Sequence, residues 1–469
     1  MSTGSRLGDL FAEAMRKEKL EDSNEEFDVM YQTGFLALDY LNGTMIHVKS
    51  DKIDMQYRSV GIADGSSNMF IGRSGCGKST LVTQIIGKIA KDFEDCHIFY
   101  DDIEKSLPMS RKEFTLGLNK EQLAKKLHFR DKGITSENVY KRIQAIRDIK
   151  VSNKSDFMYD TGLYDTYGNK IVKMIPTIYF IDSFAMLMPE DIIDKEEIDA
   201  GMGATKIAKS NTSLIKKISQ LLREANILLF SINHIMDDVQ TGFIPKAAQI
   251  SGLKQGERLP GGKTALYIAN NMFRLDDKGT LKDSEGYGIN GTVVDITIVK
   301  SRSNQNKTSV PLIFSKTEGC FDDTLSMFHF LKTRGALSGA GKMYFDELPE
   351  VKFSQKEFKT VLAESKDLQM VFARKCREYL DPLLSDTANK EIQTKTVDIS
   401  ALVNSLEDWG IEMKIVVKKE GEVIFISDDE SYINIELDEY DIVRTKTHTG
   451  SKLFNDINEL NIVRIQTAP

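Results

Sequence analysis

Short apolar runs alternate with amphipathic stretches along the first three quarters of the chain, an order typical of α/β proteins. Runs of four to eight residues that end in polar side chains predict buried strands at residues 68–71, 97–100, 177–183 and 227–234. Apolar side chains at helical spacing predict helices over residues 80–90 and 212–224. The pattern therefore predicts an α/β fold with a mostly parallel central sheet and flanking helices.

Weaker patterns complete the expected order of elements. They predict an amphipathic helix over 6–20 and a linker over 21–26, a polar, Gly-containing segment over 49–67, a largely helical stretch over 105–149, a hairpin over 156–174, a mobile loop over 186–211, strands over 292–300 and 307–314 (the second at a sheet edge), and helix over 355–384. After about residue 396, short alternating strands and acidic clusters follow.

A Gly/Ser-rich segment at residues 335–341 predicts a domain boundary. We therefore expect an N-terminal helix and linker (1–30), an α/β core (31–335) and a smaller C-terminal α+β domain with an acidic end (336–469).

Composition narrows the class of protein. The 469 residues are 41% hydrophobic and 28% charged, as expected of a soluble globular chain, and no apolar run approaches a membrane span. The four cysteines are too far apart to suggest a zinc site or a disulfide framework, which favours a reducing cytoplasm. The net charge of −8 means that any nucleic-acid contact must come from local basic loops.

The strongest motif is G-x-x-x-x-G-K-S at residues 72–79, between the first predicted strand and helix. Glycines let backbone N–H groups surround a phosphate, and the helix N-terminus adds a positive dipole end. Lys78 is expected to reach the β- and γ-phosphates, and Ser79 to ligate Mg²⁺. The predicted phosphate contacts are Gly72, Arg73, Ser74, Gly75, Cys76, Gly77, Lys78, Ser79 and Thr80.

Polar residues end each of the later predicted strands, where ligands bind in open α/β sheets. Asp182 is expected to hold Mg²⁺ through a water molecule. Asp102 and Glu104 could share a face and polarise the attacking water, or could merely end a strand. His234 could sense the γ-phosphate, or could be a hydrogen-bonded structural histidine.

Two later segments carry cations. The long loop over 235–259 places basic side chains among apolar ones, which suits single-stranded nucleic acid but also a solvated surface loop. Its candidate residues are Phe243, Lys246, Lys254 and Arg258. Lys300 and Arg302 end a predicted strand and could reach a phosphate on the same subunit or a neighbour, or could form a solvated turn.

Taken in order, these segments resemble the RecA family of DNA recombinases, and the phage UvsX-type members look most similar. Besides the phosphate loop, the matching segments are T-G-F-L-A-L-D at 33–39, D-I-E at 102–104, I-D-S at 181–183, N-H at 233–234, G-G-K-T-A-L at 261–266 leading to Arg274-Leu275, and V-K-S-R at 299–302.

The resemblance implies an ATP- and Mg²⁺-dependent DNA recombinase, in which Glu104 is the catalytic base. The strand before Asp102 is slightly longer than in the family, so Asp101 could be the water-activating carboxylate instead. It implies that Lys300 and Arg302 reach the ATP of the neighbouring subunit in a helical filament. Residues 188–206, which include Lys206, and 236–260 would line the axis where single-stranded DNA lies.

The same resemblance implies partners: single-stranded and homologous duplex DNA, further copies of the chain, a single-strand-binding protein and a recombination mediator, but no membrane. The N-terminal helix would pack on the adjacent subunit. A phage-encoded chain would act in the host cytoplasm.

Two other functions share part of the pattern. A hexameric replicative helicase would use Lys78, Glu104 and Asp182, but the segment before the core is too short for a separate N-terminal domain. A non-enzymatic regulatory module would not need Lys78, Ser79, Glu104 and Asp182 together.

Overall fold

The structure is a computed structural model, and it describes residues 29–49, 54–105, 107–164, 170–193, 200–237, 252–260, 269–281, 291–301, 308–386, 413–419, 422–427, 436–437 and 443–444. The helix predicted over 6–20 and the linker over 21–26 lie outside these residues. The same is true of most of the chain after residue 386.

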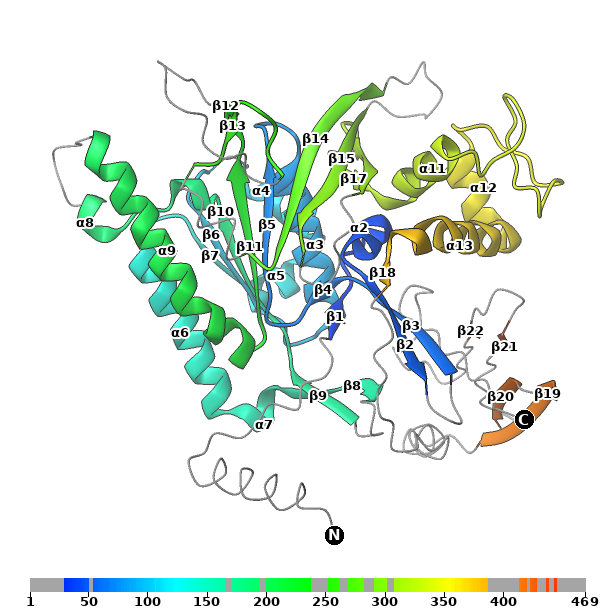
Figure 1. Ribbon diagram of the computed structural model, residues 1–469, viewed down its shortest axis with the longest axis horizontal. Coiled ribbons are helices and arrows are strands. Elements are labelled where there is room, and N and C mark those ends of the chain that lie inside the picture. Colours follow the sequence, from blue (N-terminus) through cyan, green and yellow to red (C-terminus); the bar gives the residue numbers. More distant parts are fainter. Residues whose placement is uncertain are drawn as a thin grey trace, which may run out of the picture.

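A nine-stranded sheet forms the centre of the molecule (Figure 1), in the order β17-β16-β15-β14-β5-β11-β10-β6-β7. Its strands are β5 (Ser67–Gly72), β6 (Ile98–Asp102), β7 (Leu127–Arg130), β10 (Thr177–Asp182), β11 (Ile227–His234), β14 (Asn271–Leu281), β15 (Gly291–Lys300), β16 (Ser309–Ser315) and β17 (Cys320–Asp322). Strands from β14 to β7 run parallel, whereas β15, β16 and β17 extend the sheet with antiparallel pairs. The predicted mostly parallel central sheet is confirmed.

Helices cover both faces because alternate strand residues point to opposite sides. In β10, Ile178 and Phe180 pack with α3 (Lys78–Asp92), whereas Tyr179 and Ile181 pack with α6 (Ser136–Ser152) and α9 (Ala200–Glu224). Figure 1 shows α6 and α9 on one side of the sheet and α3 on the other. This double cover explains the uninterrupted apolar runs in the central strands.

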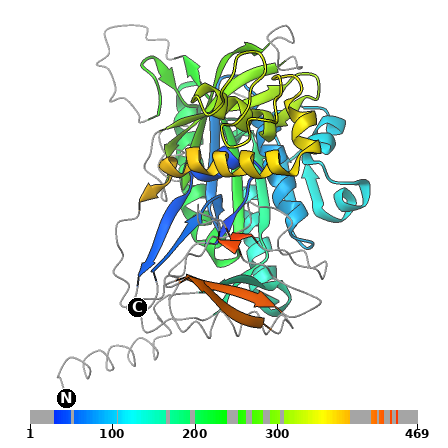
Figure 2. The ribbon, with the colours of Figure 1, turned by 90° about the vertical axis from the view of Figure 1, so that its right-hand side faces the viewer.

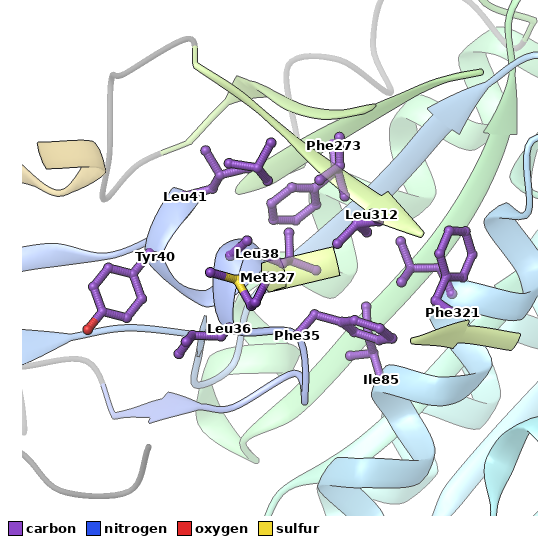
Figure 3. Packing of buried hydrophobic residues seen from close by; sticks show 14 of the residues in the cluster. Phe35, Leu36, Leu38, Tyr40, Leu41, Ile85, Phe273, Leu312, Phe321 and Met327 are labelled. Atoms are coloured by element: carbon purple, nitrogen blue, oxygen red, sulfur yellow. The ribbon is translucent and has the colours of Figure 1, made fainter. Parts of the chain in front are cut away.

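The T-G-F-L-A-L-D segment forms a capped turn and the short helix α2 (Leu36–Leu41). The backbone N–H and the hydroxyl of Thr33 donate to Asp39 Oδ1 at 2.9 and 2.7 Å, which closes the turn. Figure 3 shows the apolar side of α2 packed among residues of α3, β14, β16, β17 and α11 (Asp323–Thr333). The segment therefore packs between helix α3 and the antiparallel end of the sheet.

Several predicted elements need correction. The stretch over 105–149 contains α4 (Met109–Leu116), α5 (Lys120–Lys126) and α6, but also β7, which the polar pattern concealed. The polar segment over 49–67 contains β3 (Asp54–Ser59), paired with β2 (Thr44–Lys49). The hairpin over 156–174 is confirmed as β8 (Met158–Tyr164) and β9 (Lys170–Met174).

One predicted boundary and one predicted sheet position are also wrong. Helix α9 begins at Ala200, inside the loop predicted over 186–211, and α8 (Glu190–Ile193) and a 3₁₀ turn η1 (Phe184–Met186) precede it. Glycines in the Gly-Met-Gly stretch hid this early start, because isolated glycines lower helix propensity without forbidding a helix. Strand β16 is not at the sheet edge, since β17 pairs with it there.

Residues 336–386 pack directly on the core. Helices α12 (Phe358–Glu364) and α13 (Lys366–Leu380) share its hydrophobic cluster, and the Phe358 ring stacks on Phe328 of α11 at 4.4 Å between centroids. Beyond a turn η3 (Asp381–Leu383), β18 (Ser385–Asp386) pairs with β2. In Figure 2 the yellow helix α13 lies across this side of the molecule, above the blue β2–β3 pair. The three-domain division stays a prediction.

Three further pairs of short strands lie outside the central sheet. They are β19 (Met413–Lys419) with β20 (Glu422–Ser427), β21 (Glu436–Leu437) with β22 (Val443–Arg444), and β1 (Met30–Tyr31) with β4 (Ile62–Ala63).

Candidate nucleotide-binding site

The phosphate loop connects the end of β5 to the start of α3 at the carboxyl edge of the parallel strands. Gly77 precedes α3 with a φ of 85°, in the left-handed region that favours glycine. A Cβ there would also lie 2.8 Å from the Phe321 ring of β17. The loop residues Arg73, Ser74 and Gly75 are exposed, whereas Cys76, Lys78 and Thr80 are buried. The loop therefore presents an open backbone surface to a ligand.

Lys78 lies beneath this loop with its ammonium group held by backbone oxygens. Its Nζ donates to the carbonyl oxygens of Gly72 and Arg73 at 3.0 and 2.8 Å. Burial lowers the pKa of Lys78, and the nearby Cys76, Glu104 and Asp182 oppose this shift. Lys78 can exchange these carbonyls for phosphate oxygens, which are stronger acceptors for a cation.

Asp182 ends β10 beside the phosphate loop and is fully buried. Burial raises its pKa to about 6, and the carboxylates of Glu104 and Asp102 add to the shift, whereas hydrogen bonds from Ser79 and Tyr100 oppose it. Within the described residues its Oδ1 has no hydrogen-bond partner. A buried carboxylate oxygen without a partner, next to a serine hydroxyl, fits a site for Mg²⁺ and its water ligands.

Glu104 and His234 meet across the same edge of the sheet. His234 ends β11, and its Nε2 lies 2.8 Å from Glu104 Oε2. The backbone N–H groups of Ile103 and Glu104 donate to the Asp182 carbonyl oxygen at 2.6 and 3.0 Å, which holds the bend that carries Glu104. Both side chains remain about one quarter exposed (Glu104 29%, His234 22%), so water reaches them. The arrangement can orient a water molecule, and a movement of Glu104 would reach the segment after β11 through His234.

Asp101, the other candidate for the water-activating carboxylate, points away from this site. Its carboxylate accepts hydrogen bonds from Arg130, Arg142 and Tyr179, at 2.7, 2.6 and 2.5 Å for the shortest contact of each, and the side chain is 0% exposed. Asp101 therefore has a structural role, and of the two carboxylates only Glu104 faces the phosphate loop.

A buried lysine binds Asp102, two residues before Glu104, and the sequence analysis did not single this lysine out. Lys112 of α4 forms a short ion pair with Asp102, and both side chains are almost inaccessible. Asp102 Oδ1 also accepts the backbone N–H of Lys105 at 3.0 Å, one residue after Glu104. The sequence analysis expected Asp102 and Glu104 to share a face of one strand. This is wrong, because β6 ends at Asp102. A lone lysine on an amphipathic helix gives no signal in the sequence.

Lys300 lies far from the phosphate loop of its own chain. It ends β15 opposite Met272 of β14, and Met272 pairs in turn with Met69 of β5, whereas Gly72 pairs with Leu275. Lys300 is thus three residues back along the sheet, roughly 10 Å from the carboxyl edge. Arg302 lies outside the described residues.

The candidate DNA-binding residues are only partly placed. Lys206 belongs to α9 rather than to a loop. Lys254 is exposed and lies 3.4 Å from Asp276, and Arg258 is exposed on β13 (Glu257–Arg258), which pairs with β12 (Met236–Asp237). Phe243 and Lys246 lie outside the described residues. The structure thus brings Lys254 and Arg258 near the end of β11 but tests no DNA contact.

Comparison with known proteins shows a weak similarity to a transporter ATP-binding protein. No family model matches the chain. The chain is 24% identical, over 223 residues, to the energy-coupling factor transporter ATP-binding protein EcfA2 of Clostridium acetobutylicum. The aligned part covers 44% of this chain and 70% of that protein. Together with the sheet and the G-x-x-x-x-G-K-S loop, this similarity indicates a P-loop NTPase core. Across the described ranges, none of the helices is long and apolar enough to cross a membrane.

Proposed function

We propose that this chain is an ATP-dependent DNA recombinase that forms helical filaments on single-stranded DNA and catalyses homologous pairing and strand exchange. The observation that carries the proposal is the 2.8 Å contact between Glu104 and His234. This contact joins Glu104, which lies beside the phosphate loop, to His234, which directly precedes the segment proposed to bind DNA. ATP is the proposed nucleotide because the similar transporter protein is named as an ATP-binding protein.

In this proposal each residue acts at a stated position. Lys78 binds the β- and γ-phosphates, Ser79 and Asp182 would hold Mg²⁺, and the bound metal would neutralise phosphate charge. Glu104 accepts a proton from the attacking water, and His234 responds to the state of the γ-phosphate through Glu104. Lys300 and Arg302 serve the site of a neighbouring subunit, and the position of Lys300 away from its own phosphate loop supports this role.

Single-stranded DNA would bind along Phe243, Lys246, Lys254, Arg258 and Lys206, mostly through its backbone, and base pairing would test homology. A single-strand-binding protein and a recombination mediator are the proposed accessory partners, and the cytoplasm is the proposed location.

A strand-exchange assay with homologous and non-homologous duplex DNA, combined with electron microscopy of the same samples, tests the proposal. We expect exchange only with homologous duplex, in the presence of ATP and Mg²⁺, and extended filaments on the single strand. Closed rings without filaments would instead indicate a hexameric helicase. ATP turnover that single-stranded DNA does not change would exclude both DNA-dependent functions.

A further inference from the structure

The phosphate loop and the segment after β11 are joined at two neighbouring points. The Gly72 carbonyl oxygen accepts the Ile235 N–H at 3.0 Å. The Arg73 guanidinium donates to both carboxylate oxygens of Asp237, at 2.5 and 3.3 Å. The side chains of Arg73 and Asp237 are 59% and 66% exposed. An ion pair this exposed stabilises a structure only weakly, so another anion can compete with it.

The same two residues of the loop hold Lys78. The carbonyl oxygens of Gly72 and Arg73 are the acceptors for Lys78 Nζ. A phosphate group in the loop needs Lys78 as a donor and so competes with these carbonyls. Any phosphate that rearranges Lys78 therefore acts on the two residues that also contact Ile235 and Asp237.

The other side of Asp237 is firmly anchored. Asp237 pairs with Glu257 in the β12–β13 ladder. Glu257 receives hydrogen bonds from buried Arg274 of β14 at 2.6 and 2.9 Å, and Arg274 also binds Asp276 and the Gly252 carbonyl oxygen. A buried network fixes β13, whereas an exposed ion pair holds β12 to the phosphate loop. We therefore expect β12, rather than β13, to move when that ion pair breaks.

We propose that the Arg73–Asp237 ion pair is a nucleotide-sensitive contact, in which the terminal phosphate of a nucleoside triphosphate competes with Asp237 for the Arg73 guanidinium. A terminal phosphate carries more negative charge than one carboxylate and offers three acceptor oxygens, so it draws Arg73 away. A diphosphate ends in a similarly charged phosphate, but at the β position, which in this proposal does not reach Arg73, so it competes less. Of the proposed function, this inference requires only that the chain binds a nucleoside triphosphate.

The test measures the dissociation constants of fluorescent ATP and ADP analogues for the full chain, with Mg²⁺ and without DNA. Asp237→Asn removes the competing carboxylate, so we expect ATP affinity to rise about two- to fivefold, with a smaller change for ADP. In an Arg73→Met background the same Asp237→Asn change is expected to have no effect, because the contested guanidinium is gone. Circular dichroism checks that each variant is folded.

Glu357→Gln is the matched control. It removes the carboxylate of a comparably exposed ion pair, Lys342–Glu357 at 2.6 Å, with side chains 58% and 50% exposed. Its nucleotide affinities should equal those of the wild type. A general effect of lost negative charge would instead raise ATP affinity in the control or in the Arg73→Met background.

The outcomes separate this inference from the proposed function. An unchanged ratio of ATP to ADP affinity in Asp237→Asn, or an equal change in the Arg73→Met background, would overturn the competition between phosphate and Asp237. A wild-type chain that does not bind ATP would overturn both proposals. A chain that shows the expected affinities but no strand exchange would overturn the recombinase proposal alone.

Discussion

Glu104 is held on two sides in a way that suits a residue that positions water. Hydrogen bonds to the Asp182 carbonyl oxygen fix its backbone, and His234 contacts its carboxylate at 2.8 Å. The side chain nevertheless stays partly exposed. A fixed carboxylate with access to water can accept a proton without first reorganising, which is the requirement for a general base.

Glu104→Gln keeps the shape and removes the base. We expect ATP turnover to fall by about 10²–10⁴-fold, while ATP binding is retained. Turnover and nucleotide affinity measured on the same preparation check this. Glu113→Gln, which changes an exposed carboxylate on α4, is the control and should leave turnover unchanged. Asp101→Asn should instead lower stability, because it leaves Arg130 and Arg142 without their shared partner; loss of turnover in a stable Asp101→Asn protein would contradict our assignment.

Lys150 gives a prediction about pH. Its Nζ donates to the Ile175 carbonyl oxygen and to Thr177 Oγ1 at 2.6 and 3.1 Å, and burial lowers its pKa to about 7. In the unfolded chain a lysine has a pKa of about 10.4. Between these two values the unfolded state binds the proton and the folded state does not, so this group makes the free energy of unfolding rise with pH.

Lys150→Met removes that contribution. We expect the free energy of unfolding of the wild type, relative to the variant, to rise between about pH 7 and 10 by at most about 1.4 kcal/mol per pH unit. Urea titrations at several pH values measure it. Lys154→Met, at an exposed position on α7 (Lys154–Phe157), is the control. Parallel pH profiles for the wild type and Lys150→Met would show that Lys150 keeps its proton when folded.

At the scale of elements, the junction of β5 and α3 shows why the phosphate loop has its shape. Gly75 and Gly77 both have φ near 80° (81° and 85°), so both avoid the cost that a side chain meets in the left-handed region. Only Gly77 also contacts the antiparallel end of the sheet, where a Cβ would meet the Phe321 ring. The loop is therefore fixed at its helix end and open at its centre.

Gly75→Ala and Gly77→Ala form a matched pair. Each substitution should lower the free energy of unfolding by about 1–2 kcal/mol because of backbone strain. The decrease should be larger for Gly77→Ala, because the Phe321 ring must also move. Denaturant unfolding without nucleotide measures both. Equal losses would mean that Phe321 adjusts at no cost and does not limit the loop.

Two strands that the sequence did not predict belong to the central sheet, β14 in its interior and β7 at its edge. Strand β14 holds Arg274, whose ion pairs anchor β13, and β7 carries Arg130, which binds Asp101. Arg274 is buried and Arg130 is partly buried, and burying a charge without a partner is costly. Their charges are tolerated because partners come from other elements, and the local pattern of apolar residues does not show those partners.

At the scale of the whole molecule, the position of Lys300 bears on whether it contacts a phosphate of its own subunit or of a neighbouring one. Lys300 lies roughly 10 Å back from the carboxyl edge that carries its own phosphate loop. If Lys300 serves a neighbouring subunit, then each complete site combines Glu104 of one copy with Lys300 of the next, as a head-to-tail assembly allows.

Mixing two inactive variants tests this assembly. In an equal mixture of Glu104→Gln and Lys300→Ala chains, the copy that supplies Glu104 to a site has an intact Glu104 in about half of the cases. The copy that supplies Lys300 is intact there in about half of the cases, so roughly a quarter of the sites are complete. We therefore expect roughly a quarter of the wild-type turnover per site on single-stranded DNA. A mixture of Glu104→Gln with the double variant should stay inactive. No recovery in the first mixture, from two folded chains that still bind ATP, would mean that Lys300 does not act on a neighbouring site.

The sequence by itself determined the central strands, the phosphate loop and the polar residues at the strand ends, because each depends on local spacing: apolar runs for β5, β10 and β11, and a contiguous motif for residues 72–79. It also named Glu104, Asp182 and His234 as candidates, but left Asp101 open as the base. Only the tertiary structure decided that Asp101 is bound by Arg130 and Arg142, since these arginines come from other elements. The Lys112–Asp102 and Arg73–Asp237 pairs likewise join residues whose closeness depends on strand order, which no local pattern records.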